Sequence, residues 1–305
     1  MPFVLDTRPD RRAFLTLTGC TFIGLATADI AAAAQAAAGQ AMPRGASQVR
    51  LAQLSDTHIP EDATDAFRGF RPVDNLRTVA GQVAQSEVTG ALIAGDLARL
   101  VGSAGDYASL AALLRPVSDR MPVGLLLGNH DDRSNFRQAF PSSAGTAQAV
   151  ANKHVMVVEQ DGLRFILLDS LLAPNITPGQ LGNAQRTWLR DFLTTAPAAP
   201  TAVFVHHTLD GADGALTDSD RLFEVLRPHT QVKAVLYGHS HRYHVDSRDG
   251  IQQINLPAVG YNFADTEPVG WIDSVWTAGG VDLTLRAIGG NQAEHGQVRA
   301  VRWLR

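Results

Sequence analysis

The sequence predicts an α/β fold in which two β-sheets lie face to face with helices on their outer sides. Three observations predict it. Strand and helix patterns alternate from residue 49 to about residue 241, short strands separated by Gly-rich turns follow, and polar clusters stand directly after five apolar runs. Alternating strands and helices build a layered α/β core, and a segment of strands alone extends its sheets.

The expected elements follow one another with short connections. Apolar runs too short for helices are assigned to buried strands, and longer runs with helical spacing to helices. Pro72 suits the first turn of a helix, and Asp161-Gly162 suits a hairpin turn. The expected strands cover 49–54, 91–94, 123–127, 155–159, 164–168, 202–205, 234–237, 244–247, 252–256, 271–276 and 281–287, and the expected helices cover 72–83, 108–114 and 185–193.

The composition indicates one large folded core. The chain has 305 residues, of which 45% are hydrophobic and 18% are charged. Its formal net charge is -4 and no cluster of Lys or Arg stands out, so a nucleic-acid polymer is not an expected partner. The single cysteine excludes a disulfide framework and a Cys-rich metal site.

Residues 1–40 carry the pattern of a twin-arginine signal peptide. Arg11 and Arg12 precede an apolar stretch from Leu15 to about Ala34, and small residues around Ala36 offer cleavage sites. We therefore expect a periplasmic or secreted protein that folds around its metal before export and meets the membrane only through this signal.

Two other interpretations of this leader stay open. The apolar stretch could remain as a hydrophobic anchor, although it is rich in Ala and Thr. Leu17-Thr18-Gly19-Cys20 also resembles a lipoprotein box, but cleavage there would leave an apolar region shorter than the usual ~7–15 residues.

Five polar clusters stand at the ends of apolar runs. They are Asp56-x-His58, Gly95-Asp96, Gly128-Asn129-His130-Asp131, His206-His207 and Gly238-His239-Ser240-His241. Side chains just past the ends of such strands gather along one edge of a sheet, where ligands bind in open α/β folds. Unpaired polar groups near a core are costly, so these donors need a partner. Two divalent metal ions would satisfy them, because carboxylate, imidazole and carboxamide groups suit Mn, Fe, Zn or Co.

The residue types and spacings suit a two-ion site. Asp96 has two oxygens and can bridge ions ~3.5–4 Å apart. Asp56 and His58 should face the same side of an extended segment, and so should His239 and His241. Glycines in three of the clusters permit tight turns and close backbone approach.

The clusters and their order resemble those of the calcineurin-like metallophosphoesterases. The similarity spans about residues 49–244 and is specific as a whole, although each piece alone is weak. It implies a four-layer αββα sandwich of two mixed β-sheets flanked by helices, in one domain over residues 48–305 that includes the β-rich C-terminal tail. It also implies a dinuclear centre. The implied ligands of the first ion are Asp56, His58, Asp96 and His241, and those of the second are Asp96, Asn129, His206 and His239.

The resemblance further implies a mechanism. A hydroxide held between the ions would attack phosphorus in line, while the ions offset the charge on the phosphoryl oxygens. His130 would contact the phosphate and protonate the leaving group instead of binding a metal. Asp131 could orient His130 by accepting its other ring proton, or it could be a solvated turn carboxylate. His207 should point away from His206, with a supporting or substrate-facing role.

Two features bear on the subtype. Purple acid phosphatases place a Tyr three residues after the bridging Asp, where this chain has Arg99, so an iron–tyrosinate centre is not expected. Arg99 could instead steer a phosphate or lie on the surface. The Gly-Asn-His-Asp form is closest to class III cyclic-nucleotide phosphodiesterases and their relatives, in which the segment matching residues 255–261 lines the substrate pocket.

Three functions stay open on sequence alone. The leading one is a dinuclear metal-dependent hydrolase of small phosphate mono- or diesters. The second is a 3',5'-cyclic-nucleotide phosphodiesterase, although export argues against a regulator of cytoplasmic cyclic AMP. The third is a non-catalytic metal-binding scaffold, which the retention of seven ligand candidates and His130 disfavours. The expected partner is a small phosphoester, and no pattern indicates an oligomeric state.

Overall fold

The computed structural model describes residues 48–211 and 214–305. The expected signal peptide and the linker after it lie outside the described residues. None of the helices within these two ranges combines the length and the apolar character that a membrane crossing requires.

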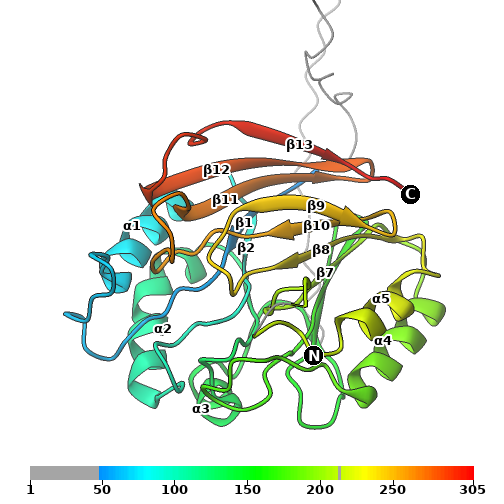
Figure 1. Cartoon of the computed structure of the whole chain (residues 1–305), viewed down its shortest axis with the longest axis horizontal. Coiled ribbons are helices and arrows are strands. Elements are labelled where there is room, and N and C mark those ends of the chain that lie inside the picture. Colours follow the sequence, from blue (N-terminus) through cyan, green and yellow to red (C-terminus); the bar gives the residue numbers. More distant parts are fainter. Residues whose placement is uncertain (1–47, 212–213) are drawn as a thin grey trace, which may run out of the picture. The chain divides into compact units, whose positions relative to one another are not determined.

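The first sheet has six strands and is mixed (Figure 1). Its order is β13-β12-β11-β1-β2-β3, in which β1, β2 and β3 are parallel and the C-terminal strands are antiparallel. β1 therefore lies inside the sheet, between β2 and β11. The strands are β1 (Val49–Leu54), β2 (Gly90–Ile93), β3 (Val123–Leu125), β11 (Pro268–Thr277), β12 (Gly280–Gly290) and β13 (Val298–Arg302).

The second sheet has seven strands in the order β4-β5-β6-β7-β8-β10-β9 and is also mixed. β6, β7, β8 and β10 are parallel, and antiparallel strands complete both ends. The strands are β4 (Thr146–Ala147), β5 (Met156–Gln160), β6 (Leu163–Leu167), β7 (Thr201–Phe204), β8 (Val232–Tyr237), β9 (His244–Arg248) and β10 (Ile251–Asn255).

Helices cover the outer face of each sheet, which gives the four-layer sandwich (Figure 1). α1 (Pro72–Gln85) and α2 (Ala104–Ser118) pack on the first sheet, and the short α3 (Arg133–Ala139) packs on α2. α4 (Asn183–Thr195) and α5 (Ser219–Leu226) pack on the second sheet. The predicted four-layer αββα architecture is confirmed.

Each central strand buries side chains on both faces. On β1, Leu51 enters the core between the sheets and Ala52 packs toward α1 and α2. On β6, Phe165 enters the same inter-sheet core and Ile166 packs toward α4 and α5. Because both faces are covered, these strands need nearly continuous apolar sequence, which is the pattern that predicted them.

The boundaries differ from the sequence-based prediction where local capping decides them. α2 begins at Ala104, earlier than predicted, because Ser103 and Asp106 form a reciprocal capping box. The prediction missed α3, which Asp132 caps by accepting from the Asn135 amide, and it also missed α5 and β13. The β-rich tail is not a separate layer, since β9 and β10 join the second sheet and β11, β12 and β13 join the first.

Replacing Phe165 by Ala tests the inter-sheet core. The buried Phe165 ring packs edge-to-face on Trp276 of the opposite sheet, with ring centroids 5.2 Å apart. The truncation removes this contact and leaves a cavity, so we expect the free energy of unfolding to fall by about 3–5 kcal/mol in a denaturant titration. Val298→Ala, at an exposed site on β13, should change it by less than about 0.5 kcal/mol. Equal effects of the two substitutions would contradict the described packing.

Candidate metal centre

All five polar clusters come together at the ends of parallel strands from both sheets. Asp56 and His58 follow β1, Asp96 follows β2, and Asn129 and His130 follow β3. The remaining clusters follow strands of the second sheet. His206 comes after β7, and His239 and His241 come after β8. The centre therefore lies where the corresponding ends of the two sheets meet.

The backbone of this centre is left-handed at five of the implied ligands. The φ angles are 52° at Asp56, 46° at His58, 47° at Asp96, 68° at His239 and 54° at His241. The predicted extended segment at Asp56-x-His58 is therefore wrong, and so is the one at His239-x-His241. Residues other than Gly rarely adopt this region, and such strain is retained mainly where the surroundings and a function require it.

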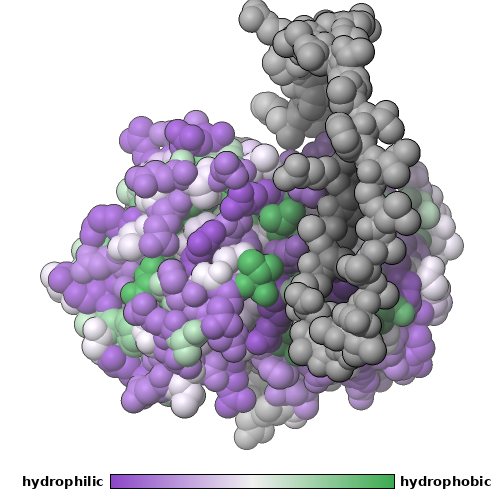
Figure 2. Space-filling view, turned by 90° about the horizontal axis from the view of Figure 1, so that it is seen from above, coloured by the Kyte–Doolittle hydropathy of each residue, from purple (hydrophilic) through white to green (hydrophobic). Residues whose placement is uncertain are grey.

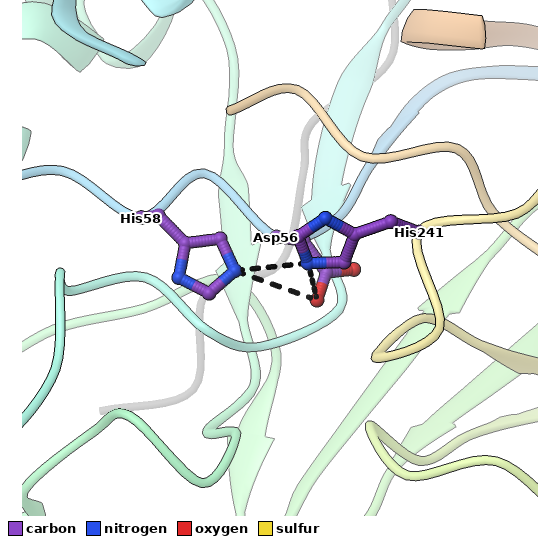
Figure 3. A group of neighbouring side chains, drawn as sticks. All are labelled: Asp56, His58 and His241. Atoms are coloured by element: carbon purple, nitrogen blue, oxygen red, sulfur yellow. Dashed lines mark hydrogen bonds and ion pairs between the residues drawn. The ribbon is translucent and has the colours of Figure 1, made fainter. Parts of the chain in front are cut away.

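Asp56, His58 and His241 form the first group of possible metal ligands (Figure 3). His58 Nε2 and His241 Nε2 lie 3.0 Å apart, and His241 Nε2 lies 3.4 Å from Asp56 Oδ1. Two imidazole nitrogens facing each other with a carboxylate oxygen need a proton or a cation between them. All three residues are buried, where unpaired polar groups are costly.

Asp96, His206 and His239 form a second group, and Asp96 also reaches toward the first. Asp96 Oδ1 lies 3.3 Å from His206 Nε2, whereas Asp96 Oδ2 lies 3.7 Å from His58 Nε2. The two oxygens of one carboxylate thus face different sets of imidazoles, which is the arrangement that a bridging ligand requires. Asn129, directly before His130, is buried, and its side-chain oxygen makes no hydrogen bond to the described residues.

Backbone carbonyls fix the orientation of three imidazole rings. His206 Nδ1 donates to the Ala94 carbonyl at 2.8 Å, and His241 Nδ1 donates to the Tyr261 carbonyl at 2.6 Å. His130 Nδ1 donates to the Leu100 carbonyl at 3.0 Å. A carbonyl only accepts, so each Nδ1 carries the proton and each Nε2 points into the centre. This support by a second group is the usual way in which proteins hold metal-binding imidazoles.

The electrostatics of the centre favour cations. Burial alone would raise the pKa of the Asp56 and Asp96 carboxyls, but neighbouring imidazoles hold both below the ordinary value. Burial lowers the pKa of His58 to about 3 and that of His239 to about 4, so both rings are neutral and offer lone pairs. Burial alone would lower the pKa of His206, but Asp96 and Asp56 raise it to about 9. Two buried carboxylates therefore attract positive charge, and the donor set fits divalent ions.

Asp131 has neither of the two roles that the sequence suggested. Its carboxylate is buried and accepts hydrogen bonds from the Gly128, Leu97 and Ala98 amides and from the Tyr107 hydroxyl, not from His130. Burial raises the pKa of Asp131 to about 7. The residue ties the loop after β2 to the loop after β3, so the earlier interpretations as a partner of His130 or a solvated carboxylate were wrong.

Two other residues singled out in the sequence are also placed. His207 is buried, its Nδ1 lies 2.7 Å from Ser170 Oγ, and its ring centroid lies 4.8 Å from that of His239. Arg99 is partly buried, and its Nε donates to Asp65 Oδ2 at 2.7 Å.

Sequence reasoning missed several contacts at and around the centre. Ser55 donates to Asp56 Oδ2, and Tyr107 donates to Asp131. Tyr261 lies at the end of the segment assigned to the substrate pocket, and its ring stacks on His58 with centroids 4.8 Å apart. Ser55 could have been found from its position directly before the first cluster. Tyr107 could not, because it lies on a helix with no motif.

Two glycines allow the clusters to approach one another. A Cβ on Gly128 would lie 2.2 Å from Asp96 Oδ1 and 2.7 Å from His206 Nε2. A Cβ on Gly238 would lie 1.9 Å from Ser55 Oγ. No real Cβ fits at these distances, so any side chain there would displace the ligand candidates.

Replacing Gly128 by Ala should therefore weaken metal binding at least about tenfold, the usual effect of disturbing groups that support metal ligands. The affinity can be measured by calorimetric titration of the metal-depleted protein with Mn²⁺ or Zn²⁺. Gly81→Ala is the matched control, because no atom lies within 4 Å of its added Cβ on α1. Unchanged affinity in Gly128→Ala would show that metal does not bind at Asp96 and His206.

Sequence comparisons find relatives over most of the described chain. The profile of the calcineurin-like phosphoesterase family matches residues 49–243. A probable cyclic nucleotide phosphodiesterase from Rhodococcus erythropolis is 36% identical over 205 residues, which cover 63% of this chain and 64% of that protein. The chain thus spans just under two thirds of this relative. A 3',5'-cyclic adenosine monophosphate phosphodiesterase from Haemophilus influenzae is 29% identical over 239 residues, covering 73% of this chain and 84% of the relative.

Solved structures of distant relatives have the same fold. A dimetal phosphatase from Danio rerio superposes with a TM-score of 0.64 at 16% identity, covering 84% of this chain and 99% of that one. A purple acid phosphatase from yellow lupin superposes with a TM-score of 0.60 at 14% identity, covering 84% of this chain and 53% of that one.

Proposed function

Because the chain belongs to the calcineurin-like phosphoesterase family and is a metal-dependent phosphoesterase, we propose that it hydrolyses small phosphate mono- or diesters at a centre of two divalent cations. The observation that carries the proposal is the Asp96 carboxylate, whose two oxygens face two separate groups of imidazoles. A single-ion site would not need a carboxylate shared in this way.

The residues divide between the two cations according to these groups. When bound, the cations would supply an activated hydroxide and offset negative charge on the phosphoryl oxygens. Asp96 would contact both cations and fix their separation. The first cation would be held by Asp56, His58, Asp96 and His241, and the second by Asp96, Asn129, His206 and His239.

His130 is proposed as the general acid. Its Nδ1–H is held by the Leu100 carbonyl, which leaves Nε2 directed toward the centre, 3.9 Å from Asp96 Oδ2. The ring is partly exposed, unlike the buried rings of His58 and His206, so it can meet the substrate. A protonated Nε2 in this position can donate to the leaving oxygen as the ester bond breaks.

Cyclic nucleotides are the second candidate substrate class. The Rhodococcus and Haemophilus relatives are named as phosphodiesterases of cyclic nucleotides and of 3',5'-cyclic adenosine monophosphate, respectively. Nitrophenyl monoesters, nitrophenyl diesters and 3',5'-cyclic AMP, assayed with Mn, Fe, Zn and Co separately, distinguish the candidates. Turnover of diesters alone would favour a phosphodiesterase, and no turnover with any metal would favour a scaffold.

Two substitutions separate metal binding from chemistry. Asp96→Asn should abolish binding of both ions together with activity, because one carboxylate serves both. His130→Ala should keep both ions and slow turnover by about 10²–10⁴-fold, most for esters with poor leaving groups. Metal content by elemental analysis and the rate on two esters of different leaving group would be measured for both variants. Loss of metal in His130→Ala would show that His130 is a ligand.

We also propose that the chain is exported by the twin-arginine route, on the pattern of residues 1–40. Replacing both Arg11 and Arg12 by Lys should shift the protein from the periplasmic or secreted fraction to the cytoplasmic fraction. The readouts are immunodetection of both fractions and the N-terminal sequence of the exported wild type. Export that is indifferent to the double substitution, or an uncleaved N-terminus in that fraction, would contradict the proposal.

A further inference from the structure

Three aromatic side chains form a continuous wall beside the first group of ligand candidates. This aromatic wall consists of Phe67, Tyr261 and Phe263. The Phe67 ring lies 4.6 Å from that of Tyr261, and the Phe263 ring lies 5.8 Å from it, centroid to centroid. Phe263 stacks almost parallel on His241, with centroids 4.1 Å apart and an interplanar angle of 19°. The wall therefore borders the place where a phosphoester would meet the metal centre.

The outer members of the wall expose ring surface to solvent. Phe263 is 52% exposed and Phe67 is 38% exposed, whereas Tyr261 between them is buried. The described surface seen in Figure 2 is mostly hydrophilic, with hydrophobic residues in small separate groups. A single exposed Phe is ordinary in a folded protein. Two exposed rings that both contact one buried Tyr at the edge of a candidate metal centre are less ordinary than a single exposed Phe.

The wall is held in place by contacts on both of its loops. Phe67 and Phe70 exchange two backbone hydrogen bonds of 2.9 Å, which closes the turn that carries Phe67. Arg68 pairs with Asp265 at 2.9 Å and so links this turn to the loop that carries Phe263. The guanidinium of Arg99 lies over the Phe67 ring, 5.8 Å from its centroid. The exposed rings are thus positioned before any ligand arrives, which lowers the entropy cost of binding.

We propose that the aromatic wall binds the nucleobase of a nucleotide substrate, with Phe263 as the principal stacking face. One face of Phe263 is covered by His241, and the ring is otherwise half exposed. A planar purine or pyrimidine matches such a face, whereas the ester groups of alkyl or sugar phosphates do not. The inference rests on the proposed phosphoesterase function and narrows its substrate class from phosphoesters in general to nucleotides.

An equilibrium binding experiment tests the wall without requiring catalysis. AMP and ribose 5-phosphate carry the same phosphorylated sugar, and only AMP carries a base. By saturation-transfer NMR on the Zn²⁺-loaded protein in a His130→Ala background, where turnover is slow, we expect AMP to bind about tenfold more tightly than ribose 5-phosphate, with transfer to the base protons. Phe263→Leu should lose this preference, and Phe263→Trp should keep it, because stacking depends on the aromatic face and not on the bulk of the side chain.

A turnover experiment uses two diesters with one leaving group. The nitrophenyl ester of thymidine 5'-monophosphate and methyl nitrophenyl phosphate both release nitrophenolate, but only the first has a nucleobase. We expect Phe263→Leu to lower kcat/KM about tenfold for the thymidine ester, mainly through KM, and less than about twofold for the methyl ester. Val298→Ala, exposed on β13, is the control and should change neither.

The outcomes separate this inference from the proposed function. Equal losses on both diesters, or loss of metal from Phe263→Leu, would show that the wall only supports His241 and would overturn the inference. An AMP preference that survives Phe263→Leu would overturn it as well. If the wild type turns over neither these diesters nor a nitrophenyl monoester, but its AMP preference disappears in Phe263→Leu, the inference holds and the proposed hydrolysis fails.

Discussion

The structure of the centre depends on two buried carboxylates that carry negative charge where the ends of two sheets meet. Asp56 and Asp96 are almost fully buried, and such groups are stable as anions only beside compensating positive charge. Around them the chain places imidazoles with their Nε2 atoms directed inward. The left-handed backbone at the ligand candidates and the glycines without room for a side chain both serve to bring these groups within reach.

A second network, of hydrogen bonds, fixes the position of the carboxylates relative to the rest of the centre. Asp131 accepts hydrogen bonds from the Leu97 and Ala98 amides after Asp96 and from the Gly128 amide before Asn129, and the Tyr107 hydroxyl on α2 completes its surroundings. The amide of His130 also donates to Asp96 Oδ1 at 2.9 Å. These hydrogen bonds tie the loop after β2 to the loop after β3. This explains how two short loops can hold the ligand candidates in a fixed geometry.

The sequence predicted the architecture and the meeting of the clusters because both follow from strong local patterns. Buried strands need continuous apolar runs, and chemical donors placed after them must meet at the sheet edge. The direction of the side chains did not follow, since the alternation of an extended strand does not apply to Asp56 or His241 in left-handed conformation. A local sequence pattern could not predict the role of Asp131 either, because its partners Leu97, Ala98 and Tyr107 come from two other segments.

Dependence on partners from other segments of the chain also explains the missed elements. α3 and α5 have only seven and eight residues and gain their stability from tertiary packing of Phe136, Phe223 and their neighbours, so each is too short for a repeating pattern to identify a helix. The aromatic wall joins Phe67 to Tyr261 across most of the chain, and no spacing rule connects residues so far apart.

The place of β1 in its sheet has a consequence for the order of synthesis. β1 is the first described strand, yet one of its two neighbours is β11, and the amides of Val259 and Gly260 bind the carbonyls of Ser55 and Asp56. A ribosome must therefore deliver residues up to Thr277 before the loop that carries Asp56 and His58 is enclosed. Pairing across such a sequence distance is slow compared with local folding. The nascent chain consequently spends most of its translation with Asp56 and His58, its earliest ligand candidates, unassembled, and the candidate metal centre is completed only near the end of synthesis.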